Sequence, residues 1–215
     1  MKKIIIFDLD GTLLNSLKDL WAAVNGALWS VGLPYRSEEE VRQFVGDGVD
    51  MLIRRAIGDE QNKFDDCKAA FKKLYDKDMQ NQTRPYDGVN KMLADLKAKG
   101  LEIAVLSNKY DSAVKTLCEY YFKDKISYVV GQKDGVKVKP DPAALKELLE
   151  NAGYTSDEAL YCGDGEADVL CAKAAGVDFI AAAWGFRHYS VLEKAGAKVF
   201  AGMPADVAAI VDTFM

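Results

Sequence analysis

The second half of the chain alternates short apolar runs with segments of helical periodicity. The apolar runs are rich in β-branched residues and occupy residues 102–106, 126–130, 159–162, 179–182 and 198–200. Between them, apolar residues recur at helical spacing over residues 111–121, 142–152, 167–175 and 204–214. Strands that read as continuous apolar runs favour a parallel sheet with helices on both faces. Residues 4–7 predict one more strand, so we expect an α/β fold.

The segment that follows the first strand has a different pattern. Helical periodicity without a strand pattern covers residues 17–31, 38–44, 49–57 and 62–80. Pro85 and Gly88 then interrupt the pattern, and a helix over residues 89–99 ends at Gly100. We therefore predict an α/β core domain from residues 1–15 and 85–215. A small all-helical domain is expected over residues 16–84, with Trp21, Trp29 and Tyr75 as packing aromatics.

Charge and apolar run length exclude several functions. The chain has 28 Lys and Arg against 33 Asp and Glu, a net charge of -5, so it lacks the cationic field of a nucleic-acid or anionic-membrane binder. Apolar runs such as residues 4–7 are far shorter than the ~20 residues of a membrane span, and Asp8 ends that run too early for a signal peptide. We expect a cytoplasmic protein that binds neither nucleic acid nor membrane.

Cysteine and histidine usage narrows the chemistry further. The four cysteines lack CxxC spacing and His188 is the only histidine, which disfavours a zinc site and a Ser-His-Asp triad. Cys162 and Cys171 are expected to be reduced core residues, and His188 a surface residue. The reactive groups of an enzyme of this composition would be carboxylates, hydroxyls and lysines.

Such groups follow the predicted strands. They are Asp8 and Asp10 after the first strand, Ser107-Asn108-Lys109 after the second, Asp164 and Asp168 after a later one, and Lys139 before a helix. The carboxyl ends of parallel strands meet at the ligand crevice of an open sheet, so these groups should converge. Asp8, Asp10 and Asp164 would form an oxygen-rich site suited to Mg²⁺. Ser107 and Lys139 could hold a phosphate, with one carboxylate as nucleophile and another as acid and base.

Four motifs in this order resemble the haloacid dehalogenase superfamily. They are Phe7-Asp8-Leu9-Asp10-Gly11-Thr12-Leu13, Leu106-Ser107-Asn108, Lys139-Pro140-Asp141-Pro142, and Gly163-Asp164 through Asp168. The resemblance implies a Rossmann-like parallel sheet core and a small mobile helical cap between the first two motifs. It also implies a two-step phosphoryl transfer, in which Asp8 forms an aspartyl-phosphate and Asp10 is the acid and base.

The same resemblance implies the remaining roles. Ser107, Asn108 and Lys139 would bind the transferring phosphoryl group. Mg²⁺ would be bound by the carboxylates of Asp8 and Asp164 and the backbone carbonyl of Asp10, with Asp168 as a further or water-mediated ligand. Asp10 argues against dehalogenase chemistry, because the dehalogenases of the superfamily lack this second carboxylate.

Three further stretches are similar to phosphoglycolate phosphatase-like enzymes. They are Phe44-Val45-Gly46-Asp47-Gly48, Pro85-Tyr86-Asp87-Gly88-Val89 and Trp184-Gly185-Phe186-Arg187. We therefore expect a Mg²⁺-dependent phosphatase of a small phosphorylated metabolite, with phosphoglycolate as the first candidate. A pyrophosphatase, a nucleotidase, a sugar phosphomutase and a non-enzymatic phosphoacceptor module remain alternatives, as do monomer and homodimer.

Several of these residues also have purely structural interpretations. Ser107 could cap a helix, and Asp164 and Asp168 could be first-turn acids that complement a helix dipole. Gly46, Asp47 and Gly48 could form a simple turn or a cap loop that closes over the site. Three arginines, Arg54, Arg55 and Arg187, could lie on the surface or meet a substrate carboxylate.

Overall fold

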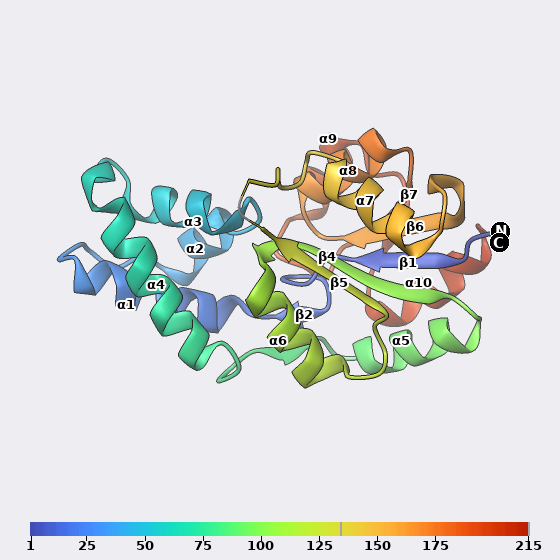
Figure 1. Ribbon diagram of the computed structural model, residues 1–215, viewed down its shortest axis with the longest axis horizontal. Helices are drawn as coiled ribbons and strands as arrows, with labels where there is room; N and C mark the ends of the chain where they lie inside the picture. Colours follow the sequence, from blue (N-terminus) through green and yellow to red (C-terminus); the bar gives the residue numbers. More distant parts are fainter. Residues whose placement is uncertain (134, 215) are drawn as a thin grey trace.

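The computed structural model describes residues 1–133 and 135–214, and Figure 1 shows their arrangement. The strands are β1 (Ile4–Phe7), β2 (Leu14–Asn15), β3 (Arg84–Pro85), β4 (Glu102–Tyr110), β5 (Tyr128–Gln132), β6 (Ala159–Gly163), β7 (Asp178–Ala182) and β8 (Phe200–Ala201). The helices are α1 (Leu17–Ser30), α2 (Glu38–Phe44), α3 (Gly48–Ile57), α4 (Phe64–Asp78), α5 (Val89–Ala98), α6 (Asp111–Phe122), α7 (Ala143–Ala152), α8 (Glu166–Ala175), α9 (Tyr189–Ala195) and α10 (Pro204–Asp212). Two short 3₁₀ helices occupy Gln61–Lys63 and Ser156–Glu158.

The main sheet has six strands in the order β5-β4-β1-β6-β7-β8. Every neighbouring pair is parallel. After β5 the chain crosses to the other side of β1, so connections leave the two sides of β1 in opposite directions. This order is that of the Rossmann-like doubly wound fold, and its ligand crevice lies at the carboxyl end of β1.

Alternate residues of the central strand enter two different cores. Ile5 and Phe7 pack in the core that includes α5, α6 and α10, whereas Ile4 and Ile6 pack in the core that includes α7 and α8. Figure 1 shows α7 and α8 on one side of the sheet and α5 and α10 on the other. Burial of all four β1 residues explains why this strand reads as a continuous apolar run. The predicted α/β fold with helices on both faces is confirmed.

The first and last residues of some helices and strands differ from the prediction. Strand β4 continues to Tyr110, with an irregular register between Leu106 and Tyr110, so Ser107 lies inside a strand. The interpretation of Ser107 as a helix cap is wrong, because α6 begins only at Asp111. The short helix α9 was not predicted, and its N-cap is the exposed His188.

Helices α1 to α4 pack on one another and lie at one end of the molecule, beyond the sheet (Figure 1). The chain leaves and returns through β2 and β3, an antiparallel pair that was not predicted. Asp19 of α1, only 4% exposed, accepts hydrogen bonds from the backbone N–H groups of Gln82 and Thr83 at 2.8–3.0 Å. The segment that enters the helical region and the segment that returns from it are thus joined by hydrogen bonds. A separately moving cap domain over residues 16–84 stays a prediction.

The predicted packing of the aromatic residues is only partly correct. Tyr75 packs in the core, but Trp29 is 71% exposed, so the prediction that Trp29 packs against the helices is wrong.

The cysteines are as predicted for Cys162 and Cys171, since all four cysteines are buried and free. Among the described residues, no helix has both the length and the apolar character needed to cross a bilayer.

Candidate active site

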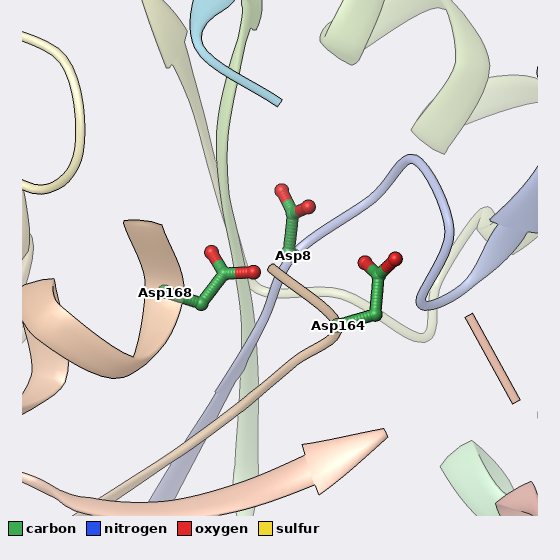
Figure 2. Close-up of side chains that lie close together, drawn as sticks. All are labelled: Asp8, Asp164 and Asp168. Atoms are coloured by element: carbon green, nitrogen blue, oxygen red, sulfur yellow. The ribbon is translucent and has the colours of Figure 1, made fainter. Parts of the chain in front are cut away.

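Three carboxylates, two of them buried and that of Asp8 partly buried, meet at the carboxyl ends of β1 and β6 (Figure 2). Asp8 follows β1, Asp164 follows β6, and Asp168 lies in the first turn of α8. One oxygen from each carboxylate lies within 4.8 Å of the others. The sequence prediction that these residues converge is therefore confirmed.

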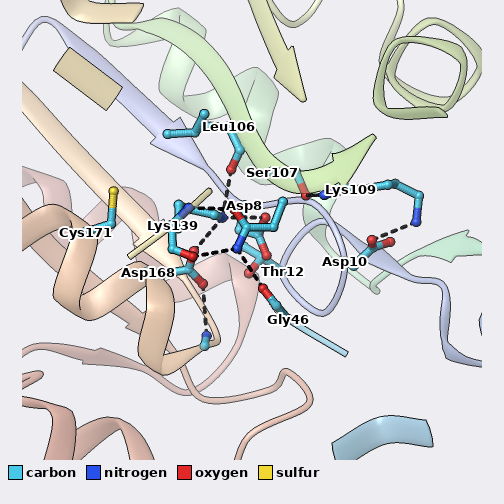
Figure 3. Close-up of polar contacts among 12 residues, drawn as sticks. Asp8, Asp10, Thr12, Gly46, Leu106, Ser107, Lys109, Lys139, Asp168 and Cys171 are labelled. Atoms are coloured by element: carbon cyan, nitrogen blue, oxygen red, sulfur yellow. Dashed lines mark hydrogen bonds and ion pairs between the residues drawn. The ribbon is translucent and has the colours of Figure 1, made fainter. Parts of the chain in front are cut away.

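Lys139 is the cation of this cluster. Its Nζ donates to oxygens of Asp8 at 2.9 Å, Asp168 at 2.6 Å and the Leu106 carbonyl at 2.9 Å (Figure 3). It also donates to the Tyr161 hydroxyl at 2.9 Å. Burial lowers the pKa of Lys139, but the charges of Asp168 and Asp8 outweigh burial and hold that pKa above its ordinary value. Lys139 is therefore a fixed positive charge beside Asp8.

The side chain of Asn108 holds the backbone of Lys139 in place. Its Nδ2 donates to the Lys139 carbonyl at 2.9 Å, and its Oδ1 accepts from the Lys139 N–H at 2.8 Å. The same Nδ2 also donates to the Gly46 carbonyl at 2.9 Å. Both amide hydrogens and the amide oxygen are thus engaged by protein backbone. The side chain positions Lys139, and phosphate binding by Asn108 stays a prediction.

Asp164 is held in a tight enclosure. It accepts hydrogen bonds from the Thr12 hydroxyl at 2.9 Å and the Phe186 N–H at 2.7 Å. A Cβ on Gly11 would lie 2.2 Å from the Asp164 carboxylate, and a Cβ on Gly185 would lie 2.2 Å from its Cβ. Only glycine leaves room for the carboxylate at these two positions.

Burial and charge repulsion raise the pKa of two of these carboxyl groups. Burial and the charges of Asp8 and Asp168 raise the pKa of Asp164 to about 8. Burial, Asp168 and Asp10 also raise the pKa of Asp8 to about 6, although Lys139 opposes them. Three carboxylates against one ammonium leave two formal negative charges when all are ionised. This hard oxygen donor set and its charge fit a divalent cation such as Mg²⁺.

Asp10 is turned away from this cluster. Its carboxylate accepts hydrogen bonds from the hydroxyl of Ser16 and from Lys109 Nζ, the latter at 2.7 Å (Figure 3). The Asp10 carboxylate does not belong to the three-carboxylate cluster. Metal binding through its backbone carbonyl stays a prediction.

Ser107 and the predicted cap loop border the site. Ser107 is 5% exposed and lines a cavity together with Asp8 and Asp10. Gly46 and Gly48 line the same cavity and have φ angles of 125° and 85°, a conformation that favours glycine. The structure therefore brings Gly46 and Gly48 to the site as predicted, and their closing over the site stays a prediction.

The three arginines and Asp47 have separate surroundings. Arg54 stacks on the Phe64 ring and does not line the two cavities that contain Asp8. Arg55 pairs with Asp47 at 2.5 Å, and both line a second cavity of about 270 Å³ that contains Asp8 and Asp164. Arg187 donates to the Arg42 carbonyl at 2.7 Å and to the Val45 carbonyl near the end of α2. Its guanidinium therefore fastens α2 to the core.

Two further residues, to which the sequence pattern assigns no chemical role, also line the site. Lys109 contacts Asp10 from the extended end of β4, and Tyr75 of α4 lines the cavity shared by Asp8 and Asp10. The position of Lys109 directly after Ser107 and Asn108 was a usable signal. Nothing in the helical pattern of α4 separates Tyr75 from ordinary packing aromatics.

Taken together, the fold and site define a doubly wound α/β protein with a helical insertion and an acidic, lysine-containing centre at the switch point. The model of the haloacid dehalogenase-like hydrolase family matches residues 5–182. The chain belongs to this family, as its four motifs predicted.

Individual relatives agree with this assignment. The chain is 38% identical over 202 residues to phosphoglycolate phosphatase 1 of Pseudomonas aeruginosa, covering 87% of this chain and 72% of that protein. It is 36% identical over 200 residues to phosphoglycolate phosphatase of Pseudomonas fluorescens, with the same shares covered. The crystal structure of a predicted phosphoglycolate phosphatase from Haemophilus somnus superposes with a TM-score of 0.91 at 31% identity, covering 98% of each chain.

Proposed function

We propose that this protein is a Mg²⁺-dependent phosphatase that hydrolyses 2-phosphoglycolate through an aspartyl-phosphate at Asp8. The observation that carries the proposal is Asp8 at the end of β1, in contact with Lys139 and beside Asp164 and Asp168. The names of the relatives at 36–38% identity support the substrate.

The reaction divides into two steps. First, a carboxylate oxygen of Asp8 attacks phosphorus, the bond from phosphorus to the leaving oxygen breaks, and Asp10 donates a proton to that oxygen. Second, Asp10 takes a proton from water, the water oxygen attacks phosphorus, and the bond between phosphorus and Asp8 breaks. Inorganic phosphate leaves, Asp8 returns to its carboxylate form, and Asp10 returns to the protonated form in which it began.

The surrounding residues would stabilise charge on the phosphoryl oxygens. Lys139 brings a fixed charge next to Asp8, and the buried Ser107 hydroxyl lines the same cavity as Asp8. Asp8, Asp164 and the Asp10 carbonyl would hold Mg²⁺, with Asp168 as a direct or water-mediated ligand. The ion would offset the negative charge of the carboxylates and polarise the phosphoryl group.

Phosphate release from a substrate panel tests this proposal. The panel contains 2-phosphoglycolate, pyrophosphate, nucleoside monophosphates and hexose phosphates, each with and without Mg²⁺. We expect the highest kcat/KM for 2-phosphoglycolate, only with Mg²⁺, and a loss of at least about a thousandfold in Asp8→Asn.

The matched control is Asp95→Asn, which makes the same change on α5 where Asp95 pairs with Lys91. It should retain wild-type activity. Retained activity in Asp8→Asn, or preferred release from pyrophosphate or a nucleotide, would overturn the proposed mechanism or substrate respectively. A phosphomutase would instead require a bisphosphorylated activator and release no net phosphate.

A further inference from the structure

The cavity beside Asp8 and Asp10 has an apolar wall and one cation. Leu20, Val49, Leu52 and Phe71 are among its apolar lining residues. Lys109 is the sole Lys or Arg among the lining residues that the structure describes. The cavity holds about 50 Å³, against roughly 10–15 Å³ for one water molecule. It therefore fits a group of a few non-hydrogen atoms.

The Lys109 ammonium has donor capacity to spare. Its side chain is 4% exposed, and Nζ lies 2.7 Å from Asp10 and 4.5 Å from the centroid of the Tyr75 ring. Asp10 is the only hydrogen-bond acceptor that the described residues offer to Nζ. An ammonium carries three N–H donors. Two of them are therefore available to a further acceptor.

Tyr75 contributes a second unused donor. The residue is 1% exposed, and its hydroxyl has no hydrogen-bond partner among the described residues. Buried hydroxyls without partners are rare because the loss of hydration is costly. Tyr75 lines the same cavity as Lys109. Two buried side chains with unused donors thus border one small space next to the proposed nucleophile.

We propose that Lys109 and Tyr75 form a subsite that binds the carboxylate of the substrate's leaving group. This inference rests on the proposed function and assigns the residues that select its substrate. A carboxylate accepts several hydrogen bonds and matches an ammonium with a neighbouring hydroxyl. The glycolate of 2-phosphoglycolate carries this carboxylate on the same carbon that bears the ester oxygen, so it is both small enough and correctly charged.

The ion pair between Lys109 and Asp10 gives the subsite a second effect. In the present arrangement Lys109 holds the Asp10 carboxylate away from the cluster around Asp8 (Figure 3). A substrate carboxylate that attracts Lys109 weakens this pair and releases Asp10 for proton transfer. Substrates with neutral leaving groups do not weaken the ion pair between Lys109 and Asp10. They are therefore turned over less efficiently even when their phosphate binds.

The test compares two substrates that differ only in this carboxylate. 2-Phosphoglycolate and 2-hydroxyethyl phosphate are assayed by phosphate release with wild type, Lys109→Met and Tyr75→Phe. Lys109→Met should lower the ratio of their kcat/KM values, 2-phosphoglycolate over 2-hydroxyethyl phosphate, by about 10- to 100-fold. Tyr75→Phe should lower the same ratio by about 5- to 10-fold. Its Tm should not fall, because the lost hydroxyl has no partner.

Tyr110→Phe is the matched control. The Tyr110 ring borders the same cavity, but its hydroxyl already donates to Asp76 at 2.6 Å. Its ratio of kcat/KM values should stay at the wild-type value.

The possible results separate this inference from the proposed function. Equal losses on both substrates in Lys109→Met would overturn the subsite and leave Lys109 as a positioning residue for Asp10. Pyrophosphate is assayed with the same variants as a third substrate. A larger loss on pyrophosphate than on 2-phosphoglycolate would assign the subsite to a phosphate and contradict a carboxylate. Absence of phosphate release by the wild-type protein from all these substrates would instead refute the proposed function.

Discussion

Replacing Asp164 by asparagine should stabilise the metal-free protein at alkaline pH, although it removes a proposed metal ligand. Burial and the neighbouring carboxylates raise the pKa of Asp164 from 3.8 to about 8. The folded protein therefore retains a proton that the unfolded chain has lost. Its stability falls as the pH rises between these two values.

The structure also sets the size of this effect. At 1.36 kcal/mol for each pH unit between the two pKa values, the penalty above pH 8 is roughly 4–6 kcal/mol. We expect roughly 2–3 kcal/mol of it to be recovered in Asp164→Asn, because relaxation and water penetration already reduce the penalty in the wild type. The amide oxygen can accept from Phe186 N–H, and the amide nitrogen can donate to the Thr12 hydroxyl oxygen.

Thermal unfolding in a chelator, across a pH series, measures this change. A gain of that size corresponds to a Tm about 5–10 °C above wild type near pH 9, and the difference should vanish near pH 4. Saturating Mg²⁺ should raise the wild-type Tm and leave the variant unchanged. A variant that is no more stable than wild type near pH 9 without metal would refute the inferred electrostatic strain at Asp164.

Other substitutions test the framework around the site. Gly185→Ala places a Cβ 2.2 Å from the Asp164 Cβ and should lower the free energy of unfolding, measured with urea, by about 1–3 kcal/mol. In Gly202→Ala the new Cβ has its nearest atom at 3.3 Å, so the free energy of unfolding should fall much less. Equal losses in the two variants would argue against the clash at Gly185. Arg187→Ala removes the donors at the end of α2, so hydrogen exchange over residues 38–45 should accelerate; unchanged exchange would contradict the fastening role. Asp19→Asn leaves backbone N–H groups of the returning chain without a full acceptor and should lower stability by about 1–3 kcal/mol, whereas an unchanged denaturation midpoint would show that the tie contributes nothing.

Much of the site could be predicted because strand ends are readable in the sequence. The apolar run over residues 4–7 ends at Asp8, and the run over residues 159–162 ends just before Asp164. In a parallel sheet both ends must reach one edge, so the meeting of these carboxylates follows from topology. The helical insertion was equally legible from its periodicity.

Other features depend on tertiary packing that no local pattern records. The polar extension of β4 around Asn108 lacks strand periodicity and pairs irregularly. The residue at which β4 ends could therefore not be predicted from the sequence. The engagement of the Asn108 amide by Lys139 and the absence of a partner for the Tyr75 hydroxyl both depend on distant segments. Arg187 reads as a surface cation until the end of α2 is placed beside it.

Identification of the phosphorylated residue tests the proposed covalent mechanism most directly. The wild-type protein is mixed with 2-phosphoglycolate and Mg²⁺, quenched in acid during turnover, reduced with borohydride and digested for mass spectrometry. An aspartyl-phosphate at Asp8 is reduced to homoserine, so the peptide that contains Asp8 and Asp10 should carry this change at Asp8 alone. Turnover without this modification, or a modification at Asp10 instead, would contradict Asp8 as the nucleophile.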